Sequence, residues 1–136
     1  MGVSGMFIEF VGAMLAGAGV SRPFFERAEN EGYSTDGCSY HRTIMGAALQ
    51  GILPEPDLLI AASFPCNGGV KAIERIGELT KKDVFVINAP YDNTEKAVDY
   101  LASQYDRLIA YVKRVTGRDL DHDKLAQSIH YNNETR

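Results

Sequence analysis

The stretch LLIAASFPCNGGVKAIERIGELTKKDVFVIN, residues 58–88, decides the fold. It contains two short apolar runs, at 58–62 and 83–88, and both are typical of strands buried on both faces of a parallel sheet. Between them, residues 67–81 place apolar side chains at helical spacing. A strand, a helix and a strand within about 30 residues form a βαβ unit, whose crossover is right-handed almost without exception. The stretch therefore predicts an α/β fold with a short parallel sheet.

The sequence on either side of this unit is predicted to be helical. Residues 7–19 are typical of a buried helix. Further helices are expected from Ser21-Arg22-Pro23 to Gly32, over 39–51, from Asn93 or Thr94 to Gly117, and from Asp121 through Leu125 and Ile129. Two strands alone make a poor sheet. Either residues 1–36 contain strands that the pattern hides, or residues outside this chain complete the sheet.

The long helix that ends at Gly117 has a clear apolar pattern. Its inner face is expected to carry the residues that recur at three and four positions, which are Val98, Leu101, Tyr105, Leu108, Ile109, Val112 and Val115. The last helix is polar, and His122 and His130 are expected to face solvent.

Length and composition limit the classes of protein that this chain can belong to. With 136 residues, 45% of them hydrophobic and 24% charged, it is expected to form one compact globular domain. A net charge of −4 without a basic cluster disfavours nucleic-acid binding. No apolar run approaches the ~20 residues that span a bilayer, and no secretory leader is visible. Two cysteines do not suggest a secreted disulfide framework, so the cytoplasm is the expected location.

The two cysteines are the first candidates for chemistry. Cys66 follows the predicted strand 58–62 at the start of a predicted helix, which is where open α/β sheets place their ligands. Cys38 also precedes a predicted helix, and a helix N-terminus lowers the pKa of a thiol. Thiolates bind soft metals and iron–sulfur clusters. The cysteines lie 28 positions apart without a C-x-x-C motif, so two unreactive thiols are the alternative.

Other polar residues could serve a site beside the cysteines. Asn67-Gly68-Gly69 could cradle an anion in a nucleotide-binding domain, or the glycines could merely permit a tight turn; the sequence matches neither the dinucleotide nor the P-loop motif. His41 and Arg42 lie about one helical turn from Cys38. Arg42 could hold a phosphate or neutralise a cluster, or the two could form an exposed basic pair. Glu9 lies in an apolar segment, so its carboxylate is expected to be hydrogen-bonded or functional.

Short groups of residues in a fixed order carry a resemblance to a known family. They are Glu31-Gly32-Tyr33-Ser34, Cys38-Ser39-Tyr40-His41-Arg42, Leu53-Pro54 with Pro56-Asp57-Leu58, Pro65-Cys66-Asn67 with Lys71, Val86-Ile87-Asn88-Ala89-Pro90, Thr116-Gly117-Arg118-Asp119-Leu120, and the stretch 125–133. Over residues 7–136 the chain resembles the 2-hydroxyacyl-CoA dehydratase family. This family includes the 2-hydroxyglutaryl-CoA dehydratase subunits and the related benzoyl-CoA reductase subunits.

The resemblance implies a fold and a cofactor. The fold is a helix-rich Rossmann-like or flavodoxin-like α/β lobe, and the cofactor is a 4Fe-4S cluster held by three cysteines, two of which match Cys38 and Cys66. The expected cofactor-binding residues are these two together with Asn67, Gly68 and Gly69. The sequence departs from the family in that no cysteine follows Cys66 and Asn67 stands where Asp is frequent. Family subunits are also far longer, so residues 1–136 are expected to form one partial lobe, the first cluster-binding lobe of a longer subunit.

The resemblance also implies a function and partners. The expected role is that of part of an iron–sulfur subunit of a radical dehydratase, a lyase that removes water from a 2-hydroxyacyl-CoA through a ketyl radical. The partners would be a second dehydratase subunit, an ATP-dependent activator that injects one electron, and the acyl-CoA substrate. The alternatives are a benzoyl-CoA reductase-type subunit and a non-catalytic scaffold that binds acyl-CoA or a partner. His41, Arg42 and Glu9 are the candidate catalytic residues. The isolated chain is expected to hold no complete cluster, to be inactive, and to self-associate through exposed apolar surface.

Overall fold

A computed structural model describes residues 5–135 of the chain. The elements follow the order α1 (Ile8–Gly17), α2 (Arg22–Asn30), α3 (Ser39–Leu49), β1 (Leu59–Ala62), α4 (Asn67–Thr80), β2 (Val84–Ile87), α5 (Glu95–Thr116) and α6 (His122–Glu134). All eight predicted elements are present, and their ends lie within a few residues of the predicted ones. No strand lies between residues 5 and 36, so hidden strands in that part do not complete the sheet.

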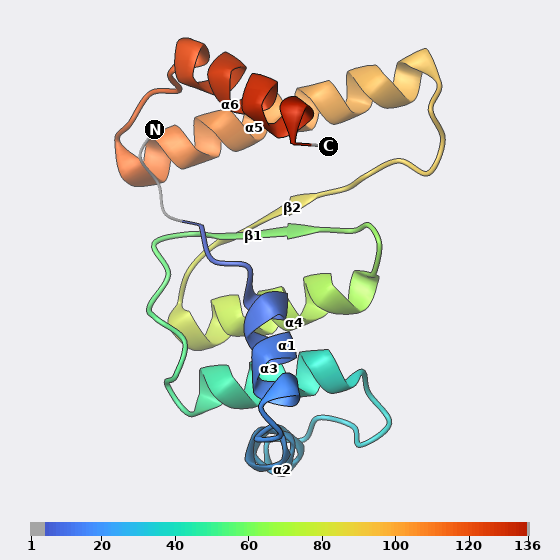
Figure 1. Ribbon diagram of the computed structural model, residues 1–136, viewed down its shortest axis with the longest axis vertical. Coiled ribbons are helices and arrows are strands. Elements are labelled where there is room, and N and C mark those ends of the chain that lie inside the picture. Colours follow the sequence, from blue (N-terminus) through green and yellow to red (C-terminus); the bar gives the residue numbers. More distant parts are fainter. Residues whose placement is uncertain (1–4, 136) are drawn as a thin grey trace.

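The βαβ unit forms as predicted. Strands β1 and β2 are parallel, with Leu59 opposite Val84 and Ala62 opposite Ile87, and α4 makes the crossover between them. Helix α4 covers one face of the sheet, and α5 packs against β2 on the opposite side (Figure 1). The chain is therefore a helix-rich α/β lobe with a two-stranded parallel sheet among the residues described.

The core lies between this sheet and the helices on the α4 side. Helix α3 packs on both α2 and α4, and α4 packs on the sheet. The buried side chains that meet there are Ala28, Ile44, Met45, Leu59, Ala61, Val70, Ile73 and Ile76. Helices α2 and α3 approach each other very closely, because a Cβ at Gly46 would lie 2.0 Å from the carbonyl oxygen of Phe24. A side chain at position 46 could not fit unless the Phe24 backbone moved, so glycine permits this close contact between α2 and the second half of α3.

The prediction that both strands are buried on two faces was wrong. Along β1 buried and exposed residues alternate, so Leu59 and Ala61 face the core while Ile60 is 42% exposed. Strand β2 is half-buried throughout. The reason is that α5 lies over β2 rather than over β1, which leaves the outer face of β1 without a helix.

Helix α1 is not the buried helix that its composition predicted. Of its residues only Gly12 is buried, and it is the point where α1 rests on Ile44 of α3. The apolar side chains Phe7, Phe10 and Met14 are exposed. Because α1 is apolar apart from Glu9 and contacts only α3 among the described elements, most of its apolar surface stays uncovered.

Helix α5 is fixed to β2 by polar contacts. The Gln104 side chain is fully buried, accepts a hydrogen bond from the Asn88 N–H and donates one to the Asn88 carbonyl, each 2.7 Å long. The Tyr111 hydroxyl donates to the Asp83 carbonyl at 2.8 Å. These anchors turn the helix so that Val98, Tyr105 and Val115 of the predicted inner face are exposed, which corrects that prediction. Val112 is buried as predicted.

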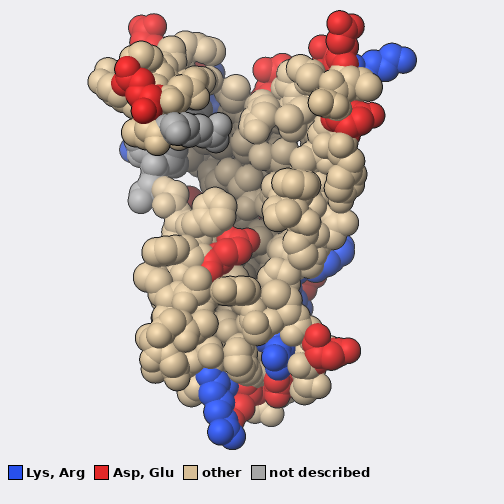
Figure 2. All heavy atoms as spheres, turned by 45° about the vertical axis from the view of Figure 1, so that its right-hand side comes forward, with Lys and Arg blue, Asp and Glu red and all other residues tan. Residues whose placement is uncertain are grey.

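Helix α6 has no buried residue and packs against no other described helix or strand. His122 and His130 are exposed, as predicted. Figure 2 shows that most charged side chains gather towards the two ends of the visible face, while mainly uncharged residues and one acidic side chain lie around a recess between them. None of the helices between residues 5 and 135 combines the length and apolar character that a bilayer crossing requires.

Candidate functional site

Both cysteines occupy the residue immediately before a helix. Cys66 follows β1 and caps α4 in an extended conformation, with φ −143° and ψ 119°. Cys38 caps α3 with a different backbone conformation, φ −51° and ψ 127°. Neither side chain accepts a capping hydrogen bond, and both residues are exposed. Each thiol therefore stands free at the positive end of a helix dipole.

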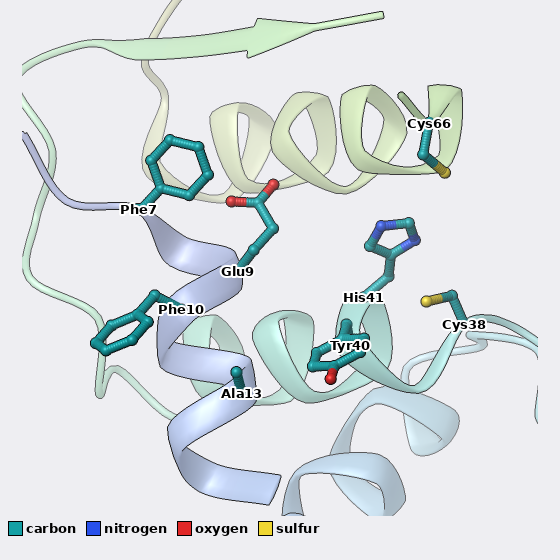
Figure 3. Close-up of a pocket in the computed structure, with 8 residues that line it drawn as sticks. All are labelled: Phe7, Glu9, Phe10, Ala13, Cys38, Tyr40, His41 and Cys66. Atoms are coloured by element: carbon teal, nitrogen blue, oxygen red, sulfur yellow. The ribbon is translucent and has the colours of Figure 1, made fainter. Parts of the chain in front are cut away.

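The two cysteines line one pocket. Its volume is ≈460 Å³, and its walls come from Phe7, Glu9, Phe10, Ala13, Cys38, Tyr40, His41 and Cys66 (Figure 3). Helix α1 forms one wall, and the starts of α3 and α4 form the others. The fold thus brings together two cysteines that are 28 positions apart in the sequence, at the rim of a single cavity.

His41 lies between the two cysteines. Its imidazole rises from α3 towards α4 (Figure 3). A Cβ built on Gly68 would lie 2.8 Å from Cε1 of the ring and 3.3 Å from Sγ of Cys66. The ring and the Cys66 sulfur therefore share the space beside the first turn of α4.

Arg42 points away from the pocket. Its guanidinium forms an ion pair with Glu29 of α2 and lies 4.7 Å from the centre of the Phe25 ring. Its side chain is only 15% exposed, and its Nε is buried without a hydrogen-bond partner. The sequence suggested that Arg42 serves the site or forms part of an exposed basic pair. The observed position, turned away from the pocket and shielded against α2, agrees with neither interpretation. The guanidinium instead ties α3 to α2.

Glu9 is exposed rather than buried, so the expected cost of burying its carboxylate does not arise. It lies on α1 and extends into the pocket on the same side as His41 (Figure 3). Asn67 is the first residue of α4 and is exposed, while Gly68 and Gly69 form the rest of the first turn. The α4 N-terminus therefore presents Cys66 and an uncharged turn to the pocket.

A larger groove continues from the cysteine pocket. It has a volume of ≈1420 Å³ and shares Phe7, Glu9, His41 and Cys66 with the smaller pocket. It runs along β1 and the loop 53–58 and reaches Val112 of α5. Its charged lining residues are Glu9, Glu55 and Asp57, and no lysine or arginine lines it in the described part of the chain. The groove is thus apolar with an acidic rim.

Four residues that line the cysteine pocket were missed from the sequence. Phe10 and Ala13 lie on α1 and Phe7 immediately precedes it, in a segment that was expected to be buried, and Tyr40 follows Cys38 by two positions. The available signal was that α1 is apolar on nearly every side, with Glu9 as its one charged residue, which means that a single packing contact cannot cover it.

The donor set fits part of an iron–sulfur or soft-metal site. Two exposed cysteine thiols at one rim can supply two ligands. Within residues 5–135 no group of three or more His, Cys, Asp or Glu side chains lies close enough together to hold a metal ion. Any complete centre therefore requires at least one ligand beyond those that the described residues bring together.

Comparisons with known proteins identify the family of the chain. The family model for the D-component of 2-hydroxyglutaryl-CoA dehydratase matches residues 4–136. The (R)-phenyllactyl-CoA dehydratase alpha subunit of Clostridium sporogenes is 28% identical over 99% of this chain and 35% of its own length. The (R)-2-hydroxyisocaproyl-CoA dehydratase alpha subunit of Clostridioides difficile is 29% identical over 75% of the chain and 27% of its own length.

A third relative is also a dehydratase alpha subunit. The (R)-2-hydroxyglutaryl-CoA dehydratase alpha subunit of Acidaminococcus fermentans is 30% identical over 63% of the chain and 19% of its own length. The chain thus spans at most about a third of the length of these relatives. Since the family model covers nearly every residue, the chain belongs to the 2-hydroxyglutaryl-CoA dehydratase D-component family.

Proposed function

We propose that this chain is the part of a 2-hydroxyacyl-CoA dehydratase subunit that presents two cysteine ligands to a 4Fe-4S cluster. The observation that carries the proposal is that Cys38 and Cys66, each at a helix N-terminus, line one pocket. Family membership and the names of the three relatives support dehydration as the reaction. The same names favour dehydration over ring reduction.

The cysteines and their helices have a defined task in this proposal. Cys38 and Cys66 would ligate the cluster as thiolates, and the positive ends of α3 and α4 would stabilise that negative charge. When bound, the cluster supplies one-electron chemistry to the thioester. A further ligand must come from outside the described pocket. The exposure of both thiols keeps them accessible to such a ligand.

The groove beside the cysteines supports an acyl group as its occupant. Its walls along β1 are apolar, and it opens at Cys66 and His41. Its acidic rim and its lack of lysine or arginine among the lining residues disfavour the phosphates of CoA. We therefore place the acyl part of the substrate in the groove and the nucleotide part of CoA outside it.

The proposed reaction also defines the partners. Elimination removes a hydroxyl from C2 and a proton from C3 of the acyl chain, so no net oxidation occurs and the electron acts only as a trigger. An ATP-dependent activator would supply that electron, and a second subunit would complete the dehydratase. The printed names of the three relatives, all alpha subunits, support a multi-subunit assembly.

An activity measurement tests this proposal. Cys38→Ser and Cys66→Ser are introduced into the assembled dehydratase, with Ser128→Ala on the exposed helix α6 as the control. Release of water from a 2-hydroxyacyl-CoA in the presence of the activator is expected to be lost in both cysteine variants and retained in the control. Full activity of either cysteine variant would contradict the proposal and would favour the scaffold alternative.

A second measurement concerns the chain by itself. Anaerobic reconstitution of the purified 136-residue chain with iron and sulfide is expected to leave it without a stoichiometric cluster, because the pocket brings together only two thiols. Iron and acid-labile sulfide at four per chain would show that no ligand from outside is needed.

A further inference from the structure

The first turn of α4 contains a notch that holds the His41 ring. A Cβ on Gly68 would lie 2.8 Å from Cε1 and 3.0 Å from Nδ1 of the imidazole, so a side chain at position 68 would require the ring to move. A Cβ on Gly69 would lie 3.8 Å from Nε2 of the same ring, which is ordinary van der Waals contact. The ring therefore fills the space that a side chain at position 68 would need.

Backbone conformation does not explain the glycine at position 68. Gly68 is not among the residues of the chain with positive φ, and it lies in regular helix. Glycine has a lower helix propensity than alanine, so a glycine in the first turn of α4 needs another reason, such as a lack of space for a side chain. The contact with His41 supplies that reason. Gly68, one of the two glycines for which the sequence suggested an anion cradle or a tight turn, makes room here for an imidazole.

The ring joins the two helix starts that carry the cysteines. His41 is the third residue of α3, which Cys38 caps, and Gly68 is the second residue of α4, which Cys66 caps. Within residues 5–135 the His41 side chain has no hydrogen bond or ion pair, so the ring acts through packing. We infer that His41, seated on Gly68, is a positioning residue that holds the Cys38 and Cys66 thiols at the distance needed to bind one centre.

This inference rests on the proposed function only in assuming that the two thiols act together. It goes further because it assigns the distance between the two thiols to the His41 ring and to the absence of a side chain at Gly68. A consequence is that His41 contributes its shape and need not supply a nitrogen. Another consequence is that Gly68 and Gly69, although adjacent, differ sharply in what they tolerate.

The test uses Cd²⁺, a soft ion that thiolates bind, and the 136-residue chain. Cd²⁺ affinity is measured from the sulfur-to-metal charge-transfer absorption, with Cys38→Ser and Cys66→Ser showing that both thiols contribute. Gly68→Ala is expected to weaken Cd²⁺ binding by roughly tenfold, because the added methyl displaces the ring or the Cys66 sulfur. Gly69→Ala, the matched control, is expected to change the affinity by less than about twofold, because its methyl meets no tight contact.

Two His41 variants separate shape from coordination. His41→Ala is expected to weaken Cd²⁺ binding as Gly68→Ala does, whereas His41→Phe, which keeps a flat ring in the notch, is expected to restore most of it. Loss of binding in His41→Phe would show that a nitrogen of His41 is a ligand, and would overturn the positioning role. Equal affinities for Gly68→Ala and Gly69→Ala would also overturn it.

The fold and the proposed function are checked separately. Thermal unfolding of each variant shows whether a loss of Cd²⁺ binding reflects global unfolding. If Gly68→Ala is unfolded, the comparison of His41→Ala with His41→Phe decides whether His41 has the positioning role. Binding of Cd²⁺ by wild type that does not depend on Cys38 would refute the inference, because the thiols would not act together. The cluster content of the assembled dehydratase is measured independently, so the proposed function can stand if the positioning role fails.

Discussion

Arg42 illustrates how a residue with a promising sequence position can have a structural task. It lies four residues after Cys38, but its guanidinium pairs with Glu29 and stacks on Phe25 in a partly buried setting. We predict that Arg42→Ala lowers the free energy of unfolding by about 2 kcal/mol, because a shielded ion pair and a cation–π contact are lost together. Urea denaturation measures this change.

Arg22→Ala is the matched control for Arg42→Ala. Arg22 also pairs with a glutamate, Glu26, but its side chain is 87% exposed. Removing such a surface pair is expected to change the free energy of unfolding by less than ~0.5 kcal/mol. Similar losses in the two variants would show that Arg42 is not the tie between α2 and α3 that the structure indicates.

Asn67 offers a second prediction at the residue scale. It is the first residue of α4, where the helix dipole favours a negative charge, and the Cys66 cap provides no side-chain acceptor. Asn67→Asp is therefore expected to raise the free energy of unfolding by about 0.3–1 kcal/mol at low salt. Asn30→Asp, at the end of α2, should have the opposite sign. Thermal unfolding at low and high salt tests both variants, and a gain that salt leaves unchanged would contradict the dipole explanation.

Single residues differ in how well the sequence predicts their positions. The cysteines were placed correctly at helix starts, because the end of a strand and the beginning of a helix are local signals in the sequence. Arg42 and Glu9 were not, because the direction of a side chain around a helix depends on which neighbour covers that helix. Periodicity alone does not contain that information.

At the scale of elements, the contact between α5 and β2 depends on protonation. Burial raises the pKa of Tyr111, and the nearby Asp83 carboxylate raises it further, while Arg114 lowers it. Because the pKa in the folded chain exceeds that in the unfolded chain, the resulting stability is complete below pH ~10 and is lost as the pH rises through the folded-state value.

Tyr111→Phe tests this dependence. The variant is expected to be less stable at neutral pH, because the Asp83 carbonyl loses its hydrogen-bond donor. The difference between wild type and variant should shrink as the pH rises above ~10, where ionised Tyr111 can no longer donate. Tyr91→Phe, at an exposed position, serves as the control. A difference that stays constant up to strongly alkaline pH would contradict the prediction.

Element boundaries were largely predictable, but the faces of the elements were not. Gly117 ends α5 with φ 67°, and Thr94 caps it by accepting from the Ala97 N–H, as their residue types indicated. The inner face of α5 was misjudged because its central anchor is Gln104, a polar residue that an apolar pattern ignores. The residues that cap a helix can be recognised from the local sequence, whereas the face that α5 buries depends on its contacts with β2.

At the scale of the whole molecule, much apolar surface is left uncovered. Phe10 on α1, Ile60 on β1 and Ile129 on α6 are all exposed, as is Phe7 immediately before α1. Exposed apolar side chains of this kind favour association in water. We predict that the 136-residue chain self-associates in a concentration series by sedimentation, and that Ile60→Lys on the open face of β1 weakens the association. A monomer at every concentration would refute this prediction.

The class of the fold was predictable from residues 58–88, since apolar runs and helical spacing define a βαβ unit wherever they occur together. How the sheet is covered could not be predicted from them. Runs of apolar residues cannot show that α5 would lie over β2 and leave Ile60 exposed, because that outcome depends on contacts between distant segments.

The most direct test of the account is the iron and acid-labile sulfide content of the assembled dehydratase, compared for wild type, Cys38→Ser and Cys66→Ser. If both thiols ligate one cluster at the pocket that they line, each single substitution should lower the iron and sulfide contents together. The two variants should then have similar iron and sulfide contents. A variant that retains the full wild-type content of iron and sulfide would show that its cysteine is not a ligand.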